Sequence, residues 1–219
     1  MTLVDGLVVH LVKAGLRFLI AVKQTKGVKV DVKTIEGKKM SHRAATEPIG
    51  SALRIAPGFS ATTVDDETGI ETTLDAIYDA DAGKYVVTTI VNRAIRPQFD
   101  EIALRHTAPQ AILQVAVPQC LAVKLDQGWT TISELTQAEG RIVPDWLAAE
   151  VVKRGTKTER MEVIQILYGA SALAGLPPVR TVQVELGVPH RTASDWIGKA
   201  RAAGYLKGMS YTPGRQADD

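Results

Sequence analysis

The side chains best suited to recognising another molecule fall in the stretch LGVPHRTASDWIGKARAAGYL, residues 186–206. At a helical period, one face of segment 190–203 carries small and polar residues: Arg191, Asp195, Gly198 and Ala202, with Ser194 at its edge. The opposite face is apolar and carries Ala193, Trp196, Ile197 and Ala200. We expect the apolar face to pack on a core, while the slim polar face fits a DNA major groove, which is about 12 Å wide.

The elements that must position this helix are predicted from spacing and turn residues. Apolar residues recur at helical intervals over segment 159–173, and a second short helix is expected over 179–186. Only Gly187, Val188 and Pro189 separate that helix from segment 190–203. Glycine accepts the left-handed backbone that ends one helix and lets the next leave at a steep angle. The last third of the chain therefore predicts a helix-turn-helix.

The run from Val182 to Ile197 resembles the DNA-binding helix-turn-helix of bacterial and phage regulators, which commonly reads VAxxLGVSxxTAxxWI. The matching residues are Val182, Leu186, Gly187, Val188, Thr192, Ala193, Trp196 and Ile197. The common tail ARxxGxL is matched by residues 200–206. Two positions depart, because Gln183 replaces a small alanine and Pro189 replaces a Ser or Thr cap. These two residues leave the crossing of the two helices open.

The resemblance implies that one set of residues faces the bases: His190, Arg191, Ser194, Asp195 and Gly198. Arg191 is the expected base reader, because a guanidinium can donate two hydrogen bonds to guanine. Asp195 has three open roles: accepting from cytosine, pairing with Arg191, or repelling phosphate. A second set is expected at phosphates, which position a protein without specifying sequence: Arg180, Thr181, Lys199, Arg201 and Lys207. Segment 207–215 is either a short basic wing or a frayed tail.

Residues 1–125 favour strands. Val28, Val30 and Val32 alternate with charged residues, which indicates a strand with one buried face. Segment 16–22 is its expected hairpin partner, although the apolar run 7–22 is also compatible with a buried helix. A second hairpin is predicted from 70–78 and 84–92, with 79–83 as its turn. Helices follow near residues 99–103 and over 109–117, where Pro118 should end or kink the helix.

These patterns predict an α+β protein: a β-rich N-terminal domain followed by an all-α helix-turn-helix domain. We expect the first domain to span 1–125 and the helix-turn-helix domain to span 159–219. Segment 126–158 is interpreted as a helical connection between them. The chain has 219 residues, which is enough for one large or two small cores.

Charge is unevenly distributed, although the net charge is only +2. Residues 1–43 carry a net +6 and residues 44–106 a net −5, followed by −1 over 107–178 and +2 over 179–219. A local positive field of this sign attracts a phosphate backbone, while chance clustering of surface charges is the plain alternative. Segment 23–43 is a candidate second phosphate contact.

Several classes of protein are disfavoured. The single cysteine, Cys120, excludes an internal disulfide and a multi-thiolate zinc site, and it favours a reducing cytoplasm. The apolar N-terminus lacks a signal-peptide pattern, and no segment is long and apolar enough for a membrane span. The four histidines lack metal-ligand spacing, and segment 79–83 opens like a calcium loop but lacks its later ligands, so we expect a turn. We find no catalytic constellation and expect no enzyme, cofactor or metal.

The function expected from these features is sequence-specific binding of double-stranded DNA by a regulator of transcription. A homodimer is expected, because one short helix reads only a few base pairs. One alternative is an interaction or assembly component whose helical module docks on a protein. Another is a part of a DNA recombination system. The whole chain is also, more weakly, similar to uncharacterised actinobacterial and actinophage proteins, a similarity that implies no chemistry.

Overall fold

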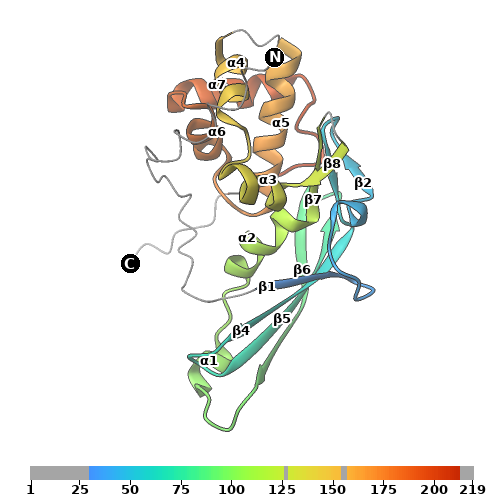
Figure 1. Cartoon of the computed structure of the whole chain (residues 1–219), viewed down its shortest axis with the longest axis vertical. Coiled ribbons are helices and arrows are strands. Elements are labelled where there is room, and N and C mark those ends of the chain that lie inside the picture. Colours follow the sequence, from blue (N-terminus) through green and yellow to red (C-terminus); the bar gives the residue numbers. More distant parts are fainter. Residues whose placement is uncertain (1–29, 126–127, 154–156, 213–219) are drawn as a thin grey trace, which may run out of the picture.

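The computed structural model describes residues 30–125, 128–153 and 157–212, and Figure 1 shows two sheets packed with helices. Sheet A is antiparallel with the order β1-β4-β5-β6: β1 (Val30–Thr34), β4 (Gly58–Asp65), β5 (Ile70–Asp79) and β6 (Lys84–Ala94). Sheet B is antiparallel with the order β2-β3-β7-β8: β2 (Glu47–Ile49), β3 (Leu53–Ile55), β7 (Leu121–Leu125) and β8 (Gly128–Thr131). This arrangement confirms a mixed α+β fold.

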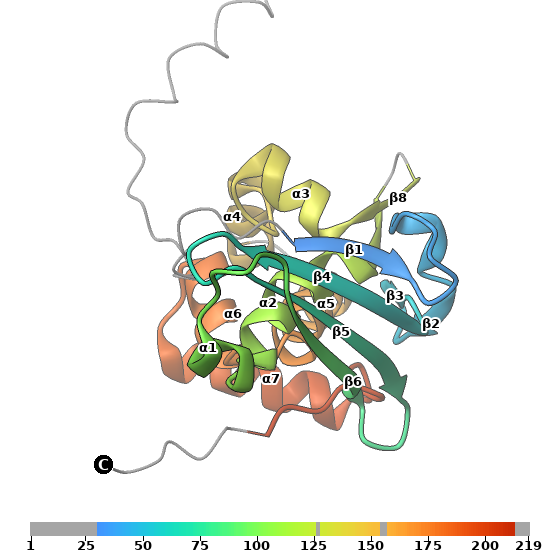
Figure 2. The ribbon, with the colours of Figure 1, turned by 90° about the horizontal axis from the view of Figure 1, so that it is seen from below.

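The helices occur mostly in the second half of the chain. Their bounds are η1 (His42–Ala44), α1 (Glu101–Arg105), α2 (Pro109–Cys120), α3 (Ile132–Glu139), α4 (Asp145–Lys153), α5 (Lys157–Leu173), α6 (Pro178–Leu186) and α7 (His190–Ala202). Figure 2 shows α2 and α5 behind one face of sheet A. The strands thus lie mostly N-terminal and the helices mostly C-terminal, as the sequence predicts.

The strand pattern of sheet A follows the predicted alternation. Val32 is buried between exposed Asp31 and Lys33, so the β1 pattern is confirmed from Val30 onward. The hairpin of β5 and β6 is also confirmed, and its turn uses the Asp79 carboxylate, which accepts from the N–H groups of Asp81 and Ala82 at 2.9 Å. The predicted strand at 16–22 lies outside the described residues.

Helix α2 continues through Pro118 to Cys120, whereas the sequence predicts an end or a kink at the proline. A proline inside a helix removes one backbone hydrogen bond. The buried side of the helix offsets this loss, because Ala116, Val117 and Cys120 are all fully buried. Tertiary packing therefore overrides the local signal.

The buried side chains form one continuous core that includes residues of both predicted domains. Leu53 and Phe59 of the sheets share this core with Ile164, Leu167 and Val182 of the C-terminal helices. The predicted boundary at residue 125 falls inside sheet B, since β8 pairs with β7 in the register Ala122 to Thr131. Segment 126–158, predicted as a helical connection, contributes β8, α3 and α4. Hydrophobic spacing along the chain does not reveal which elements share a core.

Candidate nucleic-acid interface

Helices α5, α6 and α7 pack around a shared apolar centre. Leu167 of α5, Val182 of α6, and Ala193 and Ala200 of α7 are all fully buried. Trp196 of α7 is half-buried, and the Arg160 guanidinium carbon lies 4.8 Å from the centroid of its ring. The predicted apolar face of segment 190–203 therefore does pack inward, which leaves the opposite face of α7 toward solvent.

The turn between α6 and α7 depends on a left-handed glycine. Gly187 has φ 62° and ψ 31°, and its N–H donates to the carbonyl of Gln183. The Val188 N–H donates to the same carbonyl at 3.2 Å. Pro189 precedes α7 in an extended conformation and supplies no side-chain cap. The Gln183 carbonyl thus closes the C-terminal end of α6, while the first N–H groups of α7 receive no bond from a capping side chain.

The residues expected to read bases lie together on the free side of α7. All of them are exposed: His190, Arg191, Ser194, Asp195 and Gly198. Gly198 has no atom within 4 Å of the position that a Cβ would occupy, so this part of the helix surface is open. Arg191 makes no hydrogen bond or ion pair with any residue that the structure describes. Its five N–H groups are available to a ligand.

Asp195 pairs along the helix with Lys199. The Lys199 Nζ lies 2.7 Å from Asp195 Oδ2, and both side chains are more than half exposed. Of the roles left open for Asp195, pairing with Arg191 is not the one that the structure shows. The ion pair neutralises the carboxylate on this face. An exposed pair of this kind contributes little to stability, so its partners remain free to exchange for a ligand.

The residues expected at phosphates divide into two groups. Arg180, Lys199, Arg201 and Lys207 are exposed. The Arg201 side chain is oriented by Tyr168 of α5. Its Nη2 donates to the Tyr168 hydroxyl at 2.9 Å, and its guanidinium lies over the Tyr168 ring. Thr181 does not join this surface: it is 4% exposed, and its hydroxyl donates to the Pro177 carbonyl. A buried hydroxyl with a partner inside its own helix cannot reach a phosphate.

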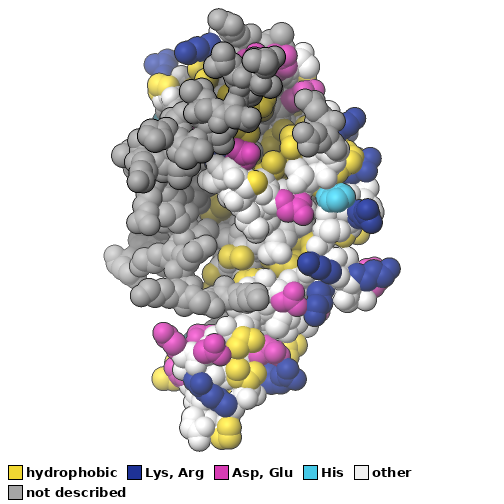
Figure 3. All heavy atoms as spheres, viewed as in Figure 1, with side chains coloured by type: hydrophobic (Ala, Val, Ile, Leu, Met, Phe, Trp, Pro, Cys, Tyr) yellow, Lys and Arg dark blue, Asp and Glu magenta, His cyan; other side chains and the backbone are white. Residues whose placement is uncertain are grey.

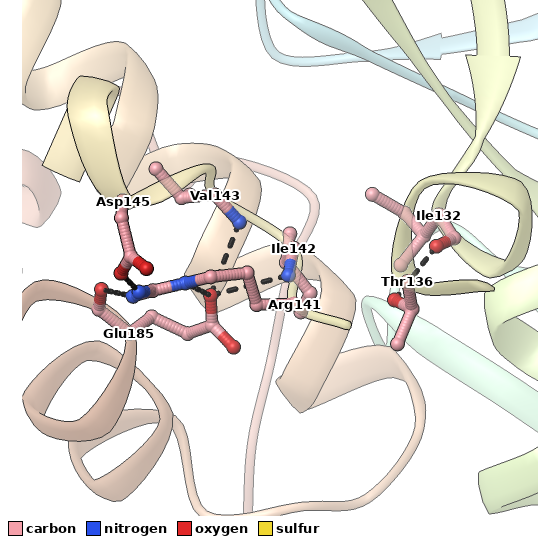
Figure 4. Close-up of polar contacts among 7 residues, drawn as sticks. All are labelled: Ile132, Thr136, Arg141, Ile142, Val143, Asp145 and Glu185. Atoms are coloured by element: carbon pink, nitrogen blue, oxygen red, sulfur yellow. Dashed lines mark hydrogen bonds and ion pairs between the residues drawn. The ribbon is translucent and has the colours of Figure 1, made fainter. Parts of the chain in front are cut away.

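A buried carboxylate ties α6 to the chain before α4 (Figure 4). Glu185 Oε2 accepts from the N–H groups of Ile142 and Val143 at 3.2 and 3.1 Å. The Arg141 guanidinium contacts the Glu185 carboxylate and carbonyl as well as the Asp145 carboxylate. Burial raises the pKa of Glu185, and the hydrogen bonds and Arg141 offset part of this rise. This network fixes the start of α4 against α6.

Sequence reasoning missed the role of Glu185, although a signal for it exists. Glu185 is three residues after the buried Val182 and one before the buried Leu186, so it lies on the inward side of α6. A carboxylate at an inward position requires partners that satisfy its charge. The sequence does not say which distant segment supplies them, and here they come from residues 141–143.

A second basic region lies between β1 and β2. Figure 3 shows Lys and Arg side chains gathered on this side of the molecule, interspersed with carboxylates. Lys38, Lys39 and Arg43 line a cleft of about 520 Å³ together with apolar Ile35 and Ile77. This region is the described part of the predicted second phosphate contact, since residues 23–29 lie outside the described residues. It does not adjoin α7 in Figure 2.

Two kinds of site receive no support from the residues that the structure describes. In ranges 30–125, 128–153 and 157–212, three or more histidine, cysteine or acidic side chains nowhere gather in a metal-binding group. Over the same ranges, every helix is too short or too polar to cross a membrane.

Comparison of the chain with protein-family models, with curated proteins and with solved structures finds no match.

Proposed function

We propose that this chain is a sequence-specific double-stranded DNA-binding protein that reads the major groove with α7 and regulates transcription. One observation carries the proposal. After the left-handed turn at Gly187, α7 buries its apolar side against α5 and α6 and leaves Arg191, Ser194 and Gly198 exposed on the other side. A helix presented in this way is the reading element of helix-turn-helix proteins.

The charges around α7 support the same proposal. Exposed cations lie on α6, on α7 and in the chain after α7: Arg180, Arg191, Arg201 and Lys207, besides Lys199. Asp195, the acidic residue of α7, is already neutralised by Lys199. Glu185 of α6 is turned inward and bonded to the backbone of residues 142 and 143. The outward charge of the module is therefore positive, as binding to phosphate requires.

Within the proposal the side chains have distinct roles. Arg191 reads guanine through its planar fork, and His190 and Ser194 contact neighbouring base edges. Gly198 allows close approach of the helix to the groove. Arg180, Arg201 and Lys207 contact phosphates, and Arg201 does so from a side chain already oriented by Tyr168.

Selection of bound duplexes from random DNA by the full chain tests the proposal, followed by fluorescence anisotropy on the selected sequence. We expect Arg191→Ala to weaken binding of the selected site about 10- to 100-fold and to relax preference at one base pair. Arg43→Ala removes the same charge from the other basic region and should leave the base preference intact. Wild-type chain that ignores DNA at every salt concentration overturns the proposal.

A further inference from the structure

The outer edge of sheet A is a long strand with an uncharged middle. Strand β6 pairs only with β5 in the part of the chain that the structure describes, so its second side faces outward. From Tyr85 to Asn92 it contains no charged residue, no proline and no glycine. Four consecutive residues, 88–91, are exposed, including Ile90 at 41% and Val91 at 53%. Such an edge is a template for pairing with another strand.

The backbone groups that remain free on β6 can be assigned from the ladder. The Ile95 N–H donates to the Gly69 carbonyl at 3.0 Å, so Ile95 points its backbone toward β5. In an antiparallel pair, backbone groups alternate in direction from one residue to the next. The backbone N–H and C=O groups of Ile90 and Asn92 therefore point away from β5. They form a row of donors and acceptors at the rim of the sheet.

The other edges of the two sheets are shorter or already covered. The outer edge of β1 is partly covered by the chain that follows it. The Thr34 N–H donates to the Lys38 carbonyl, and the Met40 N–H donates to the Val32 carbonyl. Strand β2 has three residues and contains Pro48, and β8 has four residues. Strand β6 has eleven residues, no proline and no returning turn. Its ladder with β5 shifts register at Thr88, and near its end the Asn92 side chain donates to the Leu104 carbonyl and the Thr107 hydroxyl. Figure 1 shows it running with β4 and β5 away from the helical layer.

We propose that β6 pairs antiparallel with β6 of a second copy of this chain, joining two four-stranded sheets into one. The occupant is a second copy because the strand is complementary to itself: every residue from Val86 to Val91 is β-branched. The antiparallel register centred between Thr88 and Thr89 sets β-branched side chains opposite one another over this whole stretch, and these are favourable cross-strand pairs. A two-fold pairing of this kind occupies the β6 edge of both copies, so association stops at a dimer.

The charges at the two ends of β6 permit this pairing. Arg93 Nη2 lies 2.6 Å from Glu71 Oε1 on β5, and Lys84 lies opposite Asp79 in the β5–β6 register. Arg93 is therefore ion-paired within its own sheet, whereas Lys84 lies opposite Asp79 without an ion pair among the described residues. In the register centred between Thr88 and Thr89, Lys84 of one copy lies opposite Arg93 of the other, and the Glu71 carboxylate offsets part of this repulsion.

The symmetry of the dimer places both α7 helices on the same side. Antiparallel pairing of two edge strands relates the copies by a two-fold axis perpendicular to the sheet, so equivalent faces stay together. Helices α2 and α5 cover one face of sheet A, and α7 packs on α5 (Figure 2). The dimer would present two copies of the candidate interface to one ligand. The pairing itself does not depend on the proposed DNA binding.

Sedimentation equilibrium of the full chain over a range of micromolar concentrations tests the dimer. We expect twice the chain mass of 23.6 kDa for the wild type and a monomer, with at least a tenfold larger dissociation constant, for Ile90→Lys. Val91→Lys gives the same test from the other face of the strand. The matched control is Ile35→Lys, which places the same charge on an Ile that is 52% exposed after β1, at the opposite edge of sheet A, and should leave the dimer intact.

Hydrogen exchange of the wild-type chain gives a second readout that needs no variant. The amides of Ile90 and Asn92 should be protected at high concentration and exchange faster on dilution, while inward-pointing amides of β6 should not change. A monomer at all concentrations, or a dimer that persists in both lysine variants, overturns the inference. The dimer and the proposed DNA binding can fail independently. DNA binding by a monomeric, folded Ile90→Lys chain would show that the proposed function holds without the dimer.

Discussion

The side-chain oxygen of Gln165 accepts a hydrogen bond from the Ala52 N–H at 2.9 Å, although the two residues are 113 positions apart. The same oxygen accepts from the Ser51 N–H and hydroxyl at 3.0 Å, and the Gln165 amide donates to the Tyr205 carbonyl. Gln165 is 1% exposed. One buried amide thus joins the β2–β3 turn, α5 and the chain that follows α7.

Replacing Gln165 should destabilise the whole protein, because Gln165→Ala leaves several buried donors and one carbonyl without partners. We expect the free energy of unfolding to fall by about 3 kcal/mol, as unsatisfied buried groups cost about 1–3 kcal/mol each and the site relaxes in part. Urea unfolding measures the change. Gln137→Ala, at an exposed position of α3, should change it little. An equal loss in both variants would show that the Gln165 bonds do not matter.

Two glycines, one between α6 and α7 and one inside α7, should respond in opposite ways to alanine. Gly187 has a positive φ, so Gly187→Ala should cost about 1–2 kcal/mol even though no atom crowds its Cβ position. Gly198 lies inside α7 with open space around it, so Gly198→Ala should stabilise the protein by up to about 1 kcal/mol. Thermal unfolding separates the two.

The Gly198→Ala variant also separates stability from recognition. If α7 enters a groove, an added methyl on its free face should weaken DNA binding while the protein becomes more stable. Anisotropy on a selected duplex measures the affinity. Tighter or unchanged binding by this stabilised variant would place Gly198 outside the contact surface.

Burial of Glu185 predicts a specific dependence of stability on pH. Burial raises its pKa in the folded protein above the ordinary value of about 4.5, so the folded state holds the proton to higher pH than the unfolded state. Stability from this group is therefore present below pH 4.5 and is lost as pH rises through the raised pKa. In Glu185→Gln the amide oxygen can still accept from the N–H groups of Ile142 and Val143. Because glutamine does not titrate, the loss of stability with rising pH should disappear.

Urea unfolding of the wild type and of Glu185→Gln at a series of pH values checks this dependence. The difference in unfolding free energy should shift in favour of the glutamine variant as pH rises from 4 toward 7. Glu150→Gln, on the exposed side of α4, serves as a control and should run parallel to the wild type. A constant difference for Glu185→Gln across this range would contradict the effect of burial.

Local spacing predicts the helices of the candidate interface well. The apolar period and the stops at Gly187 and Pro177 give α5, α6 and α7 to within two residues of their observed ends. The β5–β6 hairpin follows from two strand-forming runs and a short turn. These features depend on neighbours in the sequence, so the chain itself contains the information.

Features that depend on distant partners could not be predicted in this way. The spacing of Glu185 does not reveal that residues 141–143 supply its donors, and nothing near Gln165 indicates its bonds to Ser51 and Ala52. Thr181 has the sequence position of a phosphate contact, yet the packing of α6 buries it. The assignment of β8 to sheet B likewise requires the pairing with β7, which is a tertiary property.

The Asp195–Lys199 pair gives a direct test of how α7 approaches DNA. Asp195→Asn removes a negative charge and releases Lys199, so binding of mixed-sequence DNA at low salt should become several-fold tighter. The slope of log K against log salt concentration should steepen by about 0.9, which corresponds to one added phosphate contact. Asp81→Asn, an exposed site in the β5–β6 turn, should change neither quantity.

A selected duplex then distinguishes the remaining roles of Asp195. If its carboxylate accepts from cytosine, Asp195→Asn should bind the selected site less tightly while it binds mixed-sequence DNA more tightly, because a specific contact is lost and a general repulsion is removed. If Asp195 only repels phosphate, both affinities should rise together. No change in either affinity would mean that the free face of α7 does not meet DNA, because Asp195 lies at the centre of that face, between Arg191 and Lys199.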